Sequence, residues 1–536
     1  MKYTPLSLIV ASALFLNGCK EATPNKEAWL ADPRGHLKVA STGDPQTLDP
    51  RYARDLLTAN VVANLYEPLL TMSANNTAVP AAAESFTVSQ DGLTYTFKIR
   101  EAKWSDGSTV TSQQFANAWK SQLSRDSDAP NANQLYAIKN GKAVKEGALP
   151  AEKLGIETPD ARTLIVTLEN PLPYFTKLVS TYYFLPMHQN STSDALITNG
   201  PFRLETWKKN NELTAVKNPH YWDVGAVNLD KFSFINLEDH TALQMFQANQ
   251  LDWAGSPLAT LPSDAILSLK KKNQLLTTPS AGLYWFRVNT TKAPLSNTKI
   301  RQALAYAINR ESLIKNVVQG NQQAALAIIP PSMNLTDKEY FTDDNITVAW
   351  ELFQQGLKEL NMNIEDMPKI TLTYSSATER NQKIVQAIQQ QWKKVFGDKI
   401  ELKGMETKSL YQKLSQLDYD ISLGSWFADI DDPSNFLDIF SSKTNVGNNT
   451  GWENAEYAKA LEESLMPQTA EKRKEHLLKA QEILVREMPV IPLFFGTFNY
   501  VKKRNAHGID LSNLGHMYLK HAYIGDGDAT ELEVLE

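Results

Sequence analysis

The chain combines short segments with the period-two pattern of strands and longer stretches with the spacing of amphipathic helices. Residues 86–99 alternate apolar and polar positions on both sides of Asp91 and Gly92, a pair that favours a tight hairpin turn. Residues 164–168 predict another strand, and residues 202–217 predict two strands that reverse near their middle. Strands interspersed with helices predict an α/β or α+β fold rather than a repeat architecture.

Helices and strands also alternate in the second half of the chain. In the first half of the chain, Thr111 and Gln114, three residues later, form a capping box that predicts the start of a helix. Strands are predicted at 370–374 and 420–426, and helical spacing is found over 299–318, 387–395 and 470–486. Residues 427–435, rich in Asp, follow the last of these strands. Because ligands of α/β proteins meet the carboxyl ends of strands, this loop is a candidate site wall.

Composition narrows the class of protein. The 536 residues exceed what one hydrophobic core organises, so two or three domains are expected. With 42% hydrophobic and 21% charged residues, the chain is of ordinary globular composition rather than disordered or fibrous. The formal charge of −6 provides no sequence-wide positive field, so nucleic acid is not expected as a partner.

The amino terminus reads as an export signal. An apolar run over residues 6–16 follows Lys2 and is too short to span a bilayer, which predicts a signal peptide over residues 1–18. The single cysteine, Cys19, falls at the expected cut, and this segment resembles the lipobox of bacterial lipoproteins. The resemblance implies that Cys19 carries a lipid and that residues 19–35 are a tether; a buried free cysteine is the alternative.

No catalytic or metal-binding signature is found in the sequence. The zinc-protease, nucleophile-elbow, phosphate-loop, paired-cysteine and dinucleotide-binding patterns are all missing. Asp429, Asp431 and Asp432 cluster in one loop, but the glycine and the terminal Glu of a calcium loop are not there. We therefore expect neither an enzyme nor a metal, and no cofactor.

Asp429 is the most informative of these carboxylates. It lies three residues after Trp426, past the end of a predicted strand, beside the large aromatic side chains of Trp426 and Phe427. A carboxylate in such apolar surroundings is costly unless a cation meets it. Either a Lys or Arg of the protein or a cationic group of a ligand is expected to do so.

Several short motifs together resemble a known family, although each alone is weak. The stretches are residues 48–50, 64–70, 104–107 with 110–111 and Trp119, 199–202, 218–222, 300–304 and 426–429. They resemble, in order along most of the chain, the extracytoplasmic solute-binding proteins of peptide ABC transporters. Within that group they are similar to the oligopeptide-binding proteins of solute-binding protein family 5.

The resemblance implies a fold and a domain division. It implies an α/β, two-lobed periplasmic-binding-protein fold (type II, cluster C) with an extra inserted domain. Lobe I would comprise residues 36–70, 195–280 and 495–536, the inserted domain II residues 71–194, and lobe III residues 281–494.

The resemblance also implies a site and partners. Asp429 would hold the ammonium group of an oligopeptide, and the main chain of Arg54 to Leu56 and of Ser425 to Phe427 would pair with it in strand fashion. Trp285 would wall a side-chain pocket. The partners would be a membrane-embedded ABC permease with its ATPases, and a membrane through the lipid on Cys19; a monomer in the periplasm or at the cell surface is expected. The remaining candidate ligand-binding residues are Trp426, Arg287, Leu423, Thr407 and Gly255.

Two departures from the family pattern concern charge. Ala305, Asn381 and Leu423 fall where several members carry a Lys, His or Arg for the peptide carboxylate. Arg54 and Arg287 fall where well-known members carry acidic residues. Either arginine is a candidate to receive a ligand carboxylate; pairing with a protein carboxylate, or exposure to solvent, is the alternative.

Two other functions fit part of this pattern. The same fold could hold another ligand, such as a nickel chelate, haem, glutathione, a dipeptide, an oligosaccharide or a murein peptide, and Asp429 favours one that bears an amine. A secreted hydrolase would need paired carboxylates such as Asp429 and Asp431.

Overall fold

A ten-stranded mixed sheet runs through the molecule in the computed structural model, which describes residues 35–73, 77–445 and 447–525. The signal peptide, Cys19 and nearly all of the tether lie outside the described residues. The sheet order is β14 (Ile400–Met405), β13 (Ile370–Ser375), β15 (Ile421–Phe427), β12 (Leu276–Val288), β16 (Val490–Lys502), β11 (Trp253–Gly255), β1 (His36–Ser41), β10 (Lys231–Asn236), β9 (Glu212–Lys217) and β8 (Phe202–Lys208).

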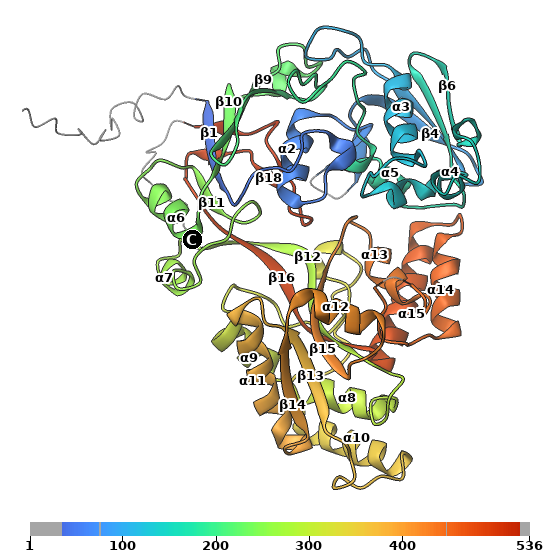
Figure 1. Cartoon of the computed structure of the whole chain (residues 1–536), viewed down its shortest axis with the longest axis vertical. Coiled ribbons are helices and arrows are strands. Elements are labelled where there is room, and N and C mark those ends of the chain that lie inside the picture. Colours follow the sequence, from blue (N-terminus) through green and yellow to red (C-terminus); the bar gives the residue numbers. More distant parts are fainter. Residues whose placement is uncertain (1–34, 74–76, 446, 526–536) are drawn as a thin grey trace, which may run out of the picture. The chain divides into compact units, whose positions relative to one another are not determined.

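Parallel and antiparallel pairs coexist in this sheet, and helices connect many of its strands. β13 runs parallel to β14 and β15, and β1 runs parallel to β10 and β11. The two longest strands, β12 and β16, pair antiparallel and lie side by side in the middle (Figure 1). The α/β class predicted from the sequence is confirmed.

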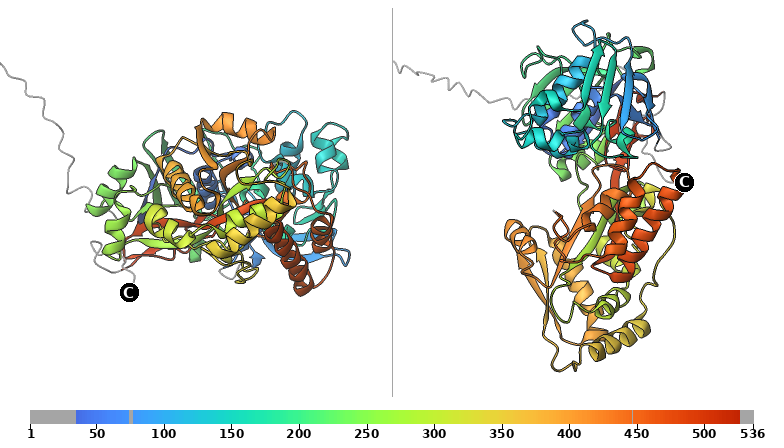
Figure 2. Two further views of the ribbon diagram at one scale, coloured as in Figure 1. Left: turned by 90° about the horizontal axis from the view of Figure 1, so that it is seen from below. Right: turned by 90° about the vertical axis from the view of Figure 1, so that its right-hand side faces the viewer.

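A separate four-stranded sheet is formed by residues 83–167, within the segment predicted as an insertion. Its order is β4 (Ala83–Val88), β5 (Thr94–Ile99), β7 (Thr163–Thr167) and β6 (Ile156–Asp160). The hairpin predicted around Asp91 and Gly92 is confirmed, with Gly92 at the left-handed φ of 71° that such a turn requires. Helix α3 (Ser112–Leu123) packs against β6 and β7, and Figure 2 (right) shows the helices of this segment on one face of the sheet.

The predicted capping box starts α3, and most other predicted helices are also found. Thr111 and Gln114 bond reciprocally at its first turn. The remaining helices are α2 (Leu56–Leu65), α4 (Gly141–Lys145), α5 (Phe175–Leu178), α6 (Asp239–Gln247), α7 (Ile266–Lys271), α8 (Thr298–Tyr306), α9 (Arg310–Leu313), α10 (Ile346–Glu359), α11 (Glu379–Phe396), α12 (Thr407–Ser415), α13 (Ser434–Leu437), α14 (Ala455–Leu465) and α15 (Ala470–Glu487). Short strand pairs complete the fold: β2 (Leu70–Met72) with β3 (Ala78–Pro80), β17 (Ala506–His507) with β20 (Tyr523–Ile524), and β18 (Asp510–Leu511) with β19 (Met517–Tyr518).

One helix prediction is wrong in part. The helical spacing over 299–318 is interrupted, because α8 ends at Tyr306 and α9 begins only at Arg310. Asn309 causes the restart: its side-chain oxygen accepts a hydrogen bond from the Ser312 amide at 2.7 Å, which is the geometry of a helix N-cap.

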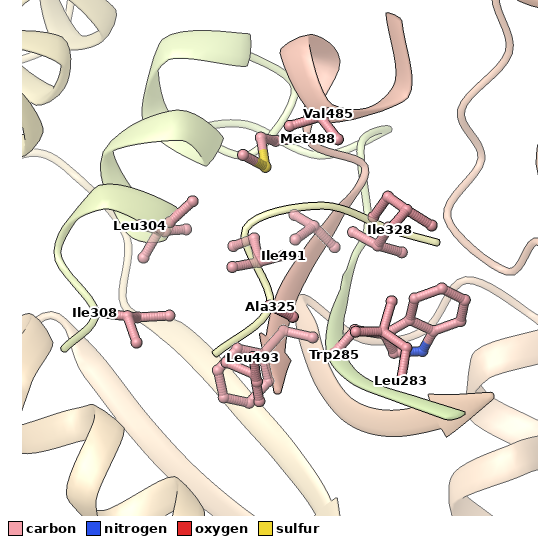
Figure 3. Close-up of a cluster of buried hydrophobic side chains, with 14 of the residues drawn as sticks. Leu283, Trp285, Leu304, Ile308, Ala325, Ile328, Val485, Met488, Ile491 and Leu493 are labelled. Carbon is pink, nitrogen blue, oxygen red and sulfur yellow. The ribbon is translucent and has the colours of Figure 1, made fainter. Parts of the chain in front are cut away.

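The buried apolar side chains form separate clusters along the chain. One large cluster draws all its buried members from residues 281–495, and Figure 3 shows Leu283 and Trp285 side by side in it. A second large cluster draws on residues 37–258, with Ile430 and residues 506–522. The boundary between the two clusters therefore falls near residues 260–280 and 496–505, close to the predicted limits of lobe III.

Candidate functional site

β15 carries most of the predicted site residues. It pairs along its whole length with β12, so that Trp285 lies opposite Gly424 and Arg287 opposite Ser422. Because side chains alternate along a strand, Phe427, Ser425 and Leu423 face one side of the sheet. Trp426 faces the other side, together with Trp285 and Arg287.

The other edge of β15 is only partly paired. β13 is the neighbour on that side, and it pairs with β15 only at Ile421 and Ser422. In the described parts of the chain no second strand pairs with Leu423 to Phe427. This stretch therefore has main-chain groups that an extended ligand can pair with.

A cavity of about 210 Å³ lies on the Phe427 side of the sheet, lined by Phe427, Tyr284, Arg380 and Ser256, the neighbour of Gly255. The Phe427 side chain is 47% exposed and meets the Tyr284 ring edge to face at 5.8 Å. Gly282 on β12 leaves room for it, since a Cβ there would collide with the Phe427 ring. The structure thus brings Phe427 and the segment of Gly255 to one wall.

A second cavity, of about 260 Å³, lies on the Trp426 side and includes Tyr174, Asp432 and Asp438 in its lining. The Trp426 indole Nε1 donates to Asn435 Oδ1 at 3.0 Å. Burial, and then the nearby Asp432, raise the pKa of Asp438 to about 7. Trp426 and Phe427, adjacent in sequence, therefore line different cavities.

Asp429 lies just past the end of this strand, and its side chain is exposed. Its amide donates to Asn435 Oδ1 at 3.2 Å, but its carboxylate has no hydrogen bond or ion pair with any described residue. Surrounding protein raises its pKa from the ordinary value by desolvation. Burial raises the pKa of Tyr182 to about 12 and also raises that of Tyr183, and the charge of Asp429 adds to both shifts, so both tyrosines lie within electrostatic reach.

The neighbouring carboxylates differ from Asp429 in having partners. Asp431 lies 3.9 Å from Lys177 and accepts from Asn513 at 2.7 Å, and Asp432 pairs with Arg473 at 2.8 Å. Over the described residues, no group of three His, Cys, Asp or Glu side chains is placed to hold a metal ion.

The two unusual arginines lie in different surroundings. Arg54 is exposed and precedes Asp55, the N-cap of α2; in the described chain it has no ion pair. Arg287 is only 6% exposed, yet it too has no hydrogen bond or ion pair with a described residue. Its guanidinium lies 5.4 Å from the Trp285 ring, and burial lowers its pKa.

The other candidate residues lie around these elements. Leu56 is the first residue of α2, Leu423 is buried, and Thr407 is the first residue of α12, with its hydroxyl 2.7 Å from Ser375 Oγ. Trp285 is fully buried and packs against Phe440 at 5.7 Å, so it lines neither of the two cavities. Sequence reasoning missed Tyr182, Tyr183, Asn435 and Arg380. Of these four residues, only Asn435 lies in the segment 427–435 that the sequence indicated as a candidate site wall.

A family comparison now decides the class of the protein. The family model described as "Bacterial extracellular solute-binding proteins, family 5 Middle" matches residues 77–448. The chain belongs to this family of solute-binding proteins. As a family 5 protein it is a binding protein rather than an enzyme, and its structure has the two-lobed α/β fold of solved members.

Relatives of this family 5 protein match it over nearly the whole chain. It is 36% identical to the oligopeptide-binding protein OppA of Bacillus subtilis (strain 168), over 97% of this chain and 99% of that protein. It is 33% identical to the dipeptide-binding protein DppE of the same organism, over 91% of each. It is 28% identical to the periplasmic murein peptide-binding protein MppA of Escherichia coli (strain K12), over 88% of this chain and 89% of that one.

The structure is also similar to solved structures of peptide-binding proteins. The unliganded open form of the murein tripeptide-binding protein MppA matches with a TM-score of 0.82 at 27% identity, over 92% of this chain and 98% of that chain. The Haemophilus influenzae OppA complex with the peptide RPPGFSPFR matches with a TM-score of 0.72 at 26% identity, over 92% and 99%. Among the described residues of this family 5 protein, no helix is both long and apolar enough for a membrane span.

Proposed function

We propose that this protein captures oligopeptides outside the cytoplasm and delivers them, as a monomer, to a membrane-embedded ABC permease and its ATPases. Relatives whose names state oligopeptide, dipeptide and murein-peptide binding support this proposal. The observation that carries it is the carboxylate of Asp429, which has no cation among the described residues and lies beside an unpaired strand edge.

The Asp429 carboxylate and the unpaired strand edge match the two groups that every free peptide has, its terminal ammonium and its main chain. An ammonium group that leaves water needs an anionic partner, and Asp429 supplies one. The peptide main chain needs hydrogen bonds, which Leu423 to Phe427 can supply by strand addition on the edge that β13 leaves unpaired. The main chain of Arg54 to Leu56, which leads into the start of α2, is the second proposed main-chain partner. Recognition of this kind depends little on the ligand's side chains.

We propose the domain division expected from the sequence: lobe I from residues 36–70, 195–280 and 495–536, domain II from 71–194, and lobe III from 281–494. The division of the buried apolar residues supports it, because one cluster is confined to residues 281–495. Strands β12 and β16 connect the two sides of that boundary. They are the proposed crossover segments about which the lobes close on a ligand.

Ligand recovery tests the proposal directly. Protein purified in its native state and then denatured is expected to release intact peptides of mixed sequence, identified by mass spectrometry, because main-chain recognition tolerates many side chains. Added peptides should also stay intact on prolonged incubation with the protein. Recovery of a non-peptide ligand alone would contradict the proposal, and steady peptide cleavage would favour the hydrolase alternative.

We also propose that the chain is a lipoprotein, anchored through Cys19 after removal of residues 1–18. A Cys19→Ser protein, produced in a bacterium with the signal intact, is expected to move from the membrane fraction to the soluble fraction. Its peptide affinity should stay unchanged, which checks that it is folded. Retention of the Cys19→Ser protein in the membrane fraction would contradict the lipid anchor.

A further inference from the structure

Arg287 is a buried cation that has no hydrogen-bond or ion-pair partner among the described residues. It lies on β12 between β15 and β16 and is only 6% exposed. Its Nε is fully enclosed and has no acceptor, and no hydrogen bond or ion pair joins its terminal nitrogens to any described residue. Because only Nε is fully enclosed, the terminal nitrogens are the part that reaches the accessible surface.

Two other buried arginines of the described chain, Arg301 and Arg310, have protein partners. Arg301 donates to the carbonyls of Leu295, Ser296 and Glu487 at 2.6 to 3.0 Å. Arg310 is paired with Asp343 at 2.8 Å. A buried guanidinium without such partners is costly, and Arg is not expected to lose its charge. The free-energy cost of burying the Arg287 charge is therefore not offset by hydrogen bonds or an ion pair with the described residues.

A second donor without an acceptor lies beside it. The indole Nε1 of Trp285 is also enclosed and has no hydrogen-bond partner in the described residues. Both donors converge on Gly424 of β15: a Cβ built there would collide with Arg287 Nη1 and would lie 3.6 Å from Trp285 Nε1. The absent side chain of Gly424 leaves the space that the guanidinium occupies over β15.

Two N–H donors that converge without an acceptor suit a group that only accepts. A carboxylate is such a group, and the planar guanidinium matches it in a bidentate manner. The location suits a peptide ligand, because the edge of β15 next to Gly424 is the one that β13 leaves unpaired.

We infer that Arg287, with Trp285 beside it, binds a carboxylate of the peptide ligand and makes the protein select peptides that carry an acidic group at one position. This inference rests on the proposed function. Gly424 precedes Asp429 by five residues, at most about 17 Å of extended chain at roughly 3.3 Å per residue. A ligand that starts at Asp429 and runs back along β15 would therefore place this carboxylate within about its first six residues.

Calorimetry with matched peptides tests the inference. The probes are alanine-based peptides with a free amino terminus, in which Glu or Gln is moved through the first six positions, each with a free or amidated carboxyl terminus. At one position the Glu peptide is expected to bind roughly 10- to 100-fold more tightly than the Gln peptide, as a charge-assisted bond to a buried cation implies. If affinity instead increased only with a free carboxyl terminus, whatever the position of Glu, Arg287 would bind the terminal carboxylate and the inferred selection for an acidic side chain would be wrong.

Two variants locate the effect. Arg287→Met should abolish the preference for the carboxylate, so that the Glu peptide and the matched Gln peptide bind the variant with equal affinity. Gly424→Ala should reduce the same preference while the charge is kept, because its Cβ displaces the guanidinium. No preference in the unsubstituted protein, or the same preference in Arg287→Met, would overturn the inference but not peptide capture. Failure to bind any peptide would overturn the proposed function itself.

Thermal unfolding separates a binding role from a structural one. Arg287→Met removes an unpaired buried charge and should leave the Tm equal to or above that of the unsubstituted protein. Arg301→Met is the matched control, and it should lower the Tm because it leaves the Leu295, Ser296 and Glu487 carbonyls without their donor. If Arg287→Met lowered the Tm as much as Arg301→Met does, Arg287 would stabilise the fold rather than select the ligand.

Discussion

Asp429→Asn is expected to lower the affinity for peptides with a free amino terminus by about 100-fold or more, measured by calorimetry. The substitution keeps the size of the side chain and removes only the charge. A ligand ammonium would then leave water without this anion to meet it, because the neighbouring carboxylates already have partners: Asp431 contacts Lys177 and Asn513, and Asp432 pairs with Arg473.

An acetylated peptide is the matched control for this experiment. It lacks the ammonium group, so it should bind weakly to the unsubstituted protein and lose little more affinity in Asp429→Asn. Equal affinity of both proteins for the free-terminus peptide would rule out Asp429 as the ammonium site.

The same pair of proteins should differ in pH dependence. Ammonium binding requires the charged carboxylate, and desolvation by the surrounding protein raises the pKa of Asp429 even though its side chain is exposed. Peptide affinity should therefore fall on acidification, and begin to fall at a higher pH than an ordinary aspartate would give. Asp429→Asn should lack this fall, since an amide does not titrate in this range.

Features set by neighbours in the sequence were predictable. The hairpin around Gly92 and the capping box of Thr111 and Gln114 depend on residues within a few positions of one another, and the structure has both. Asp429 was also identified from local context, as a carboxylate beyond a strand end with aromatic neighbours. That no described Lys or Arg pairs with its carboxylate was not predictable, because pairing depends on every segment that packs nearby.

Features set by distant segments could not be predicted from the sequence. Tyr182 and Tyr183 are about 250 positions from Asp429 and lie in a short turn (η4, Tyr182–Phe184) without a pattern of its own. The partner-free state of Arg287 is likewise a property of three strands, β12, β15 and β16, assembled from separate parts of the chain. The break at Asn309 was missed because the apolar spacing continues across it.

The loop that carries Asp429 depends on a buried ion pair. Asp432 accepts two hydrogen bonds from Arg473, at 2.8 and 3.0 Å, and it also accepts from the Ser434 amide at 3.0 Å. Asp432 is almost fully enclosed, and Arg473 is held on α15, so this pair joins the loop to a helix. Asn435, which bonds to both Trp426 and the Asp429 amide, follows directly.

Arg473→Met is therefore expected to destabilise the protein by about 3–5 kcal/mol and to weaken peptide binding as well. The cause is the buried Asp432 charge left without its cation, next to Asp438, whose pKa the same arginine lowers. Denaturant unfolding measures the loss. The double variant Asp432→Asn with Arg473→Met should recover much of the stability, because neither charge then remains buried alone. If the double variant were as unstable as Arg473→Met, the packing of the arginine against Tyr174 would be the cause instead of the charge.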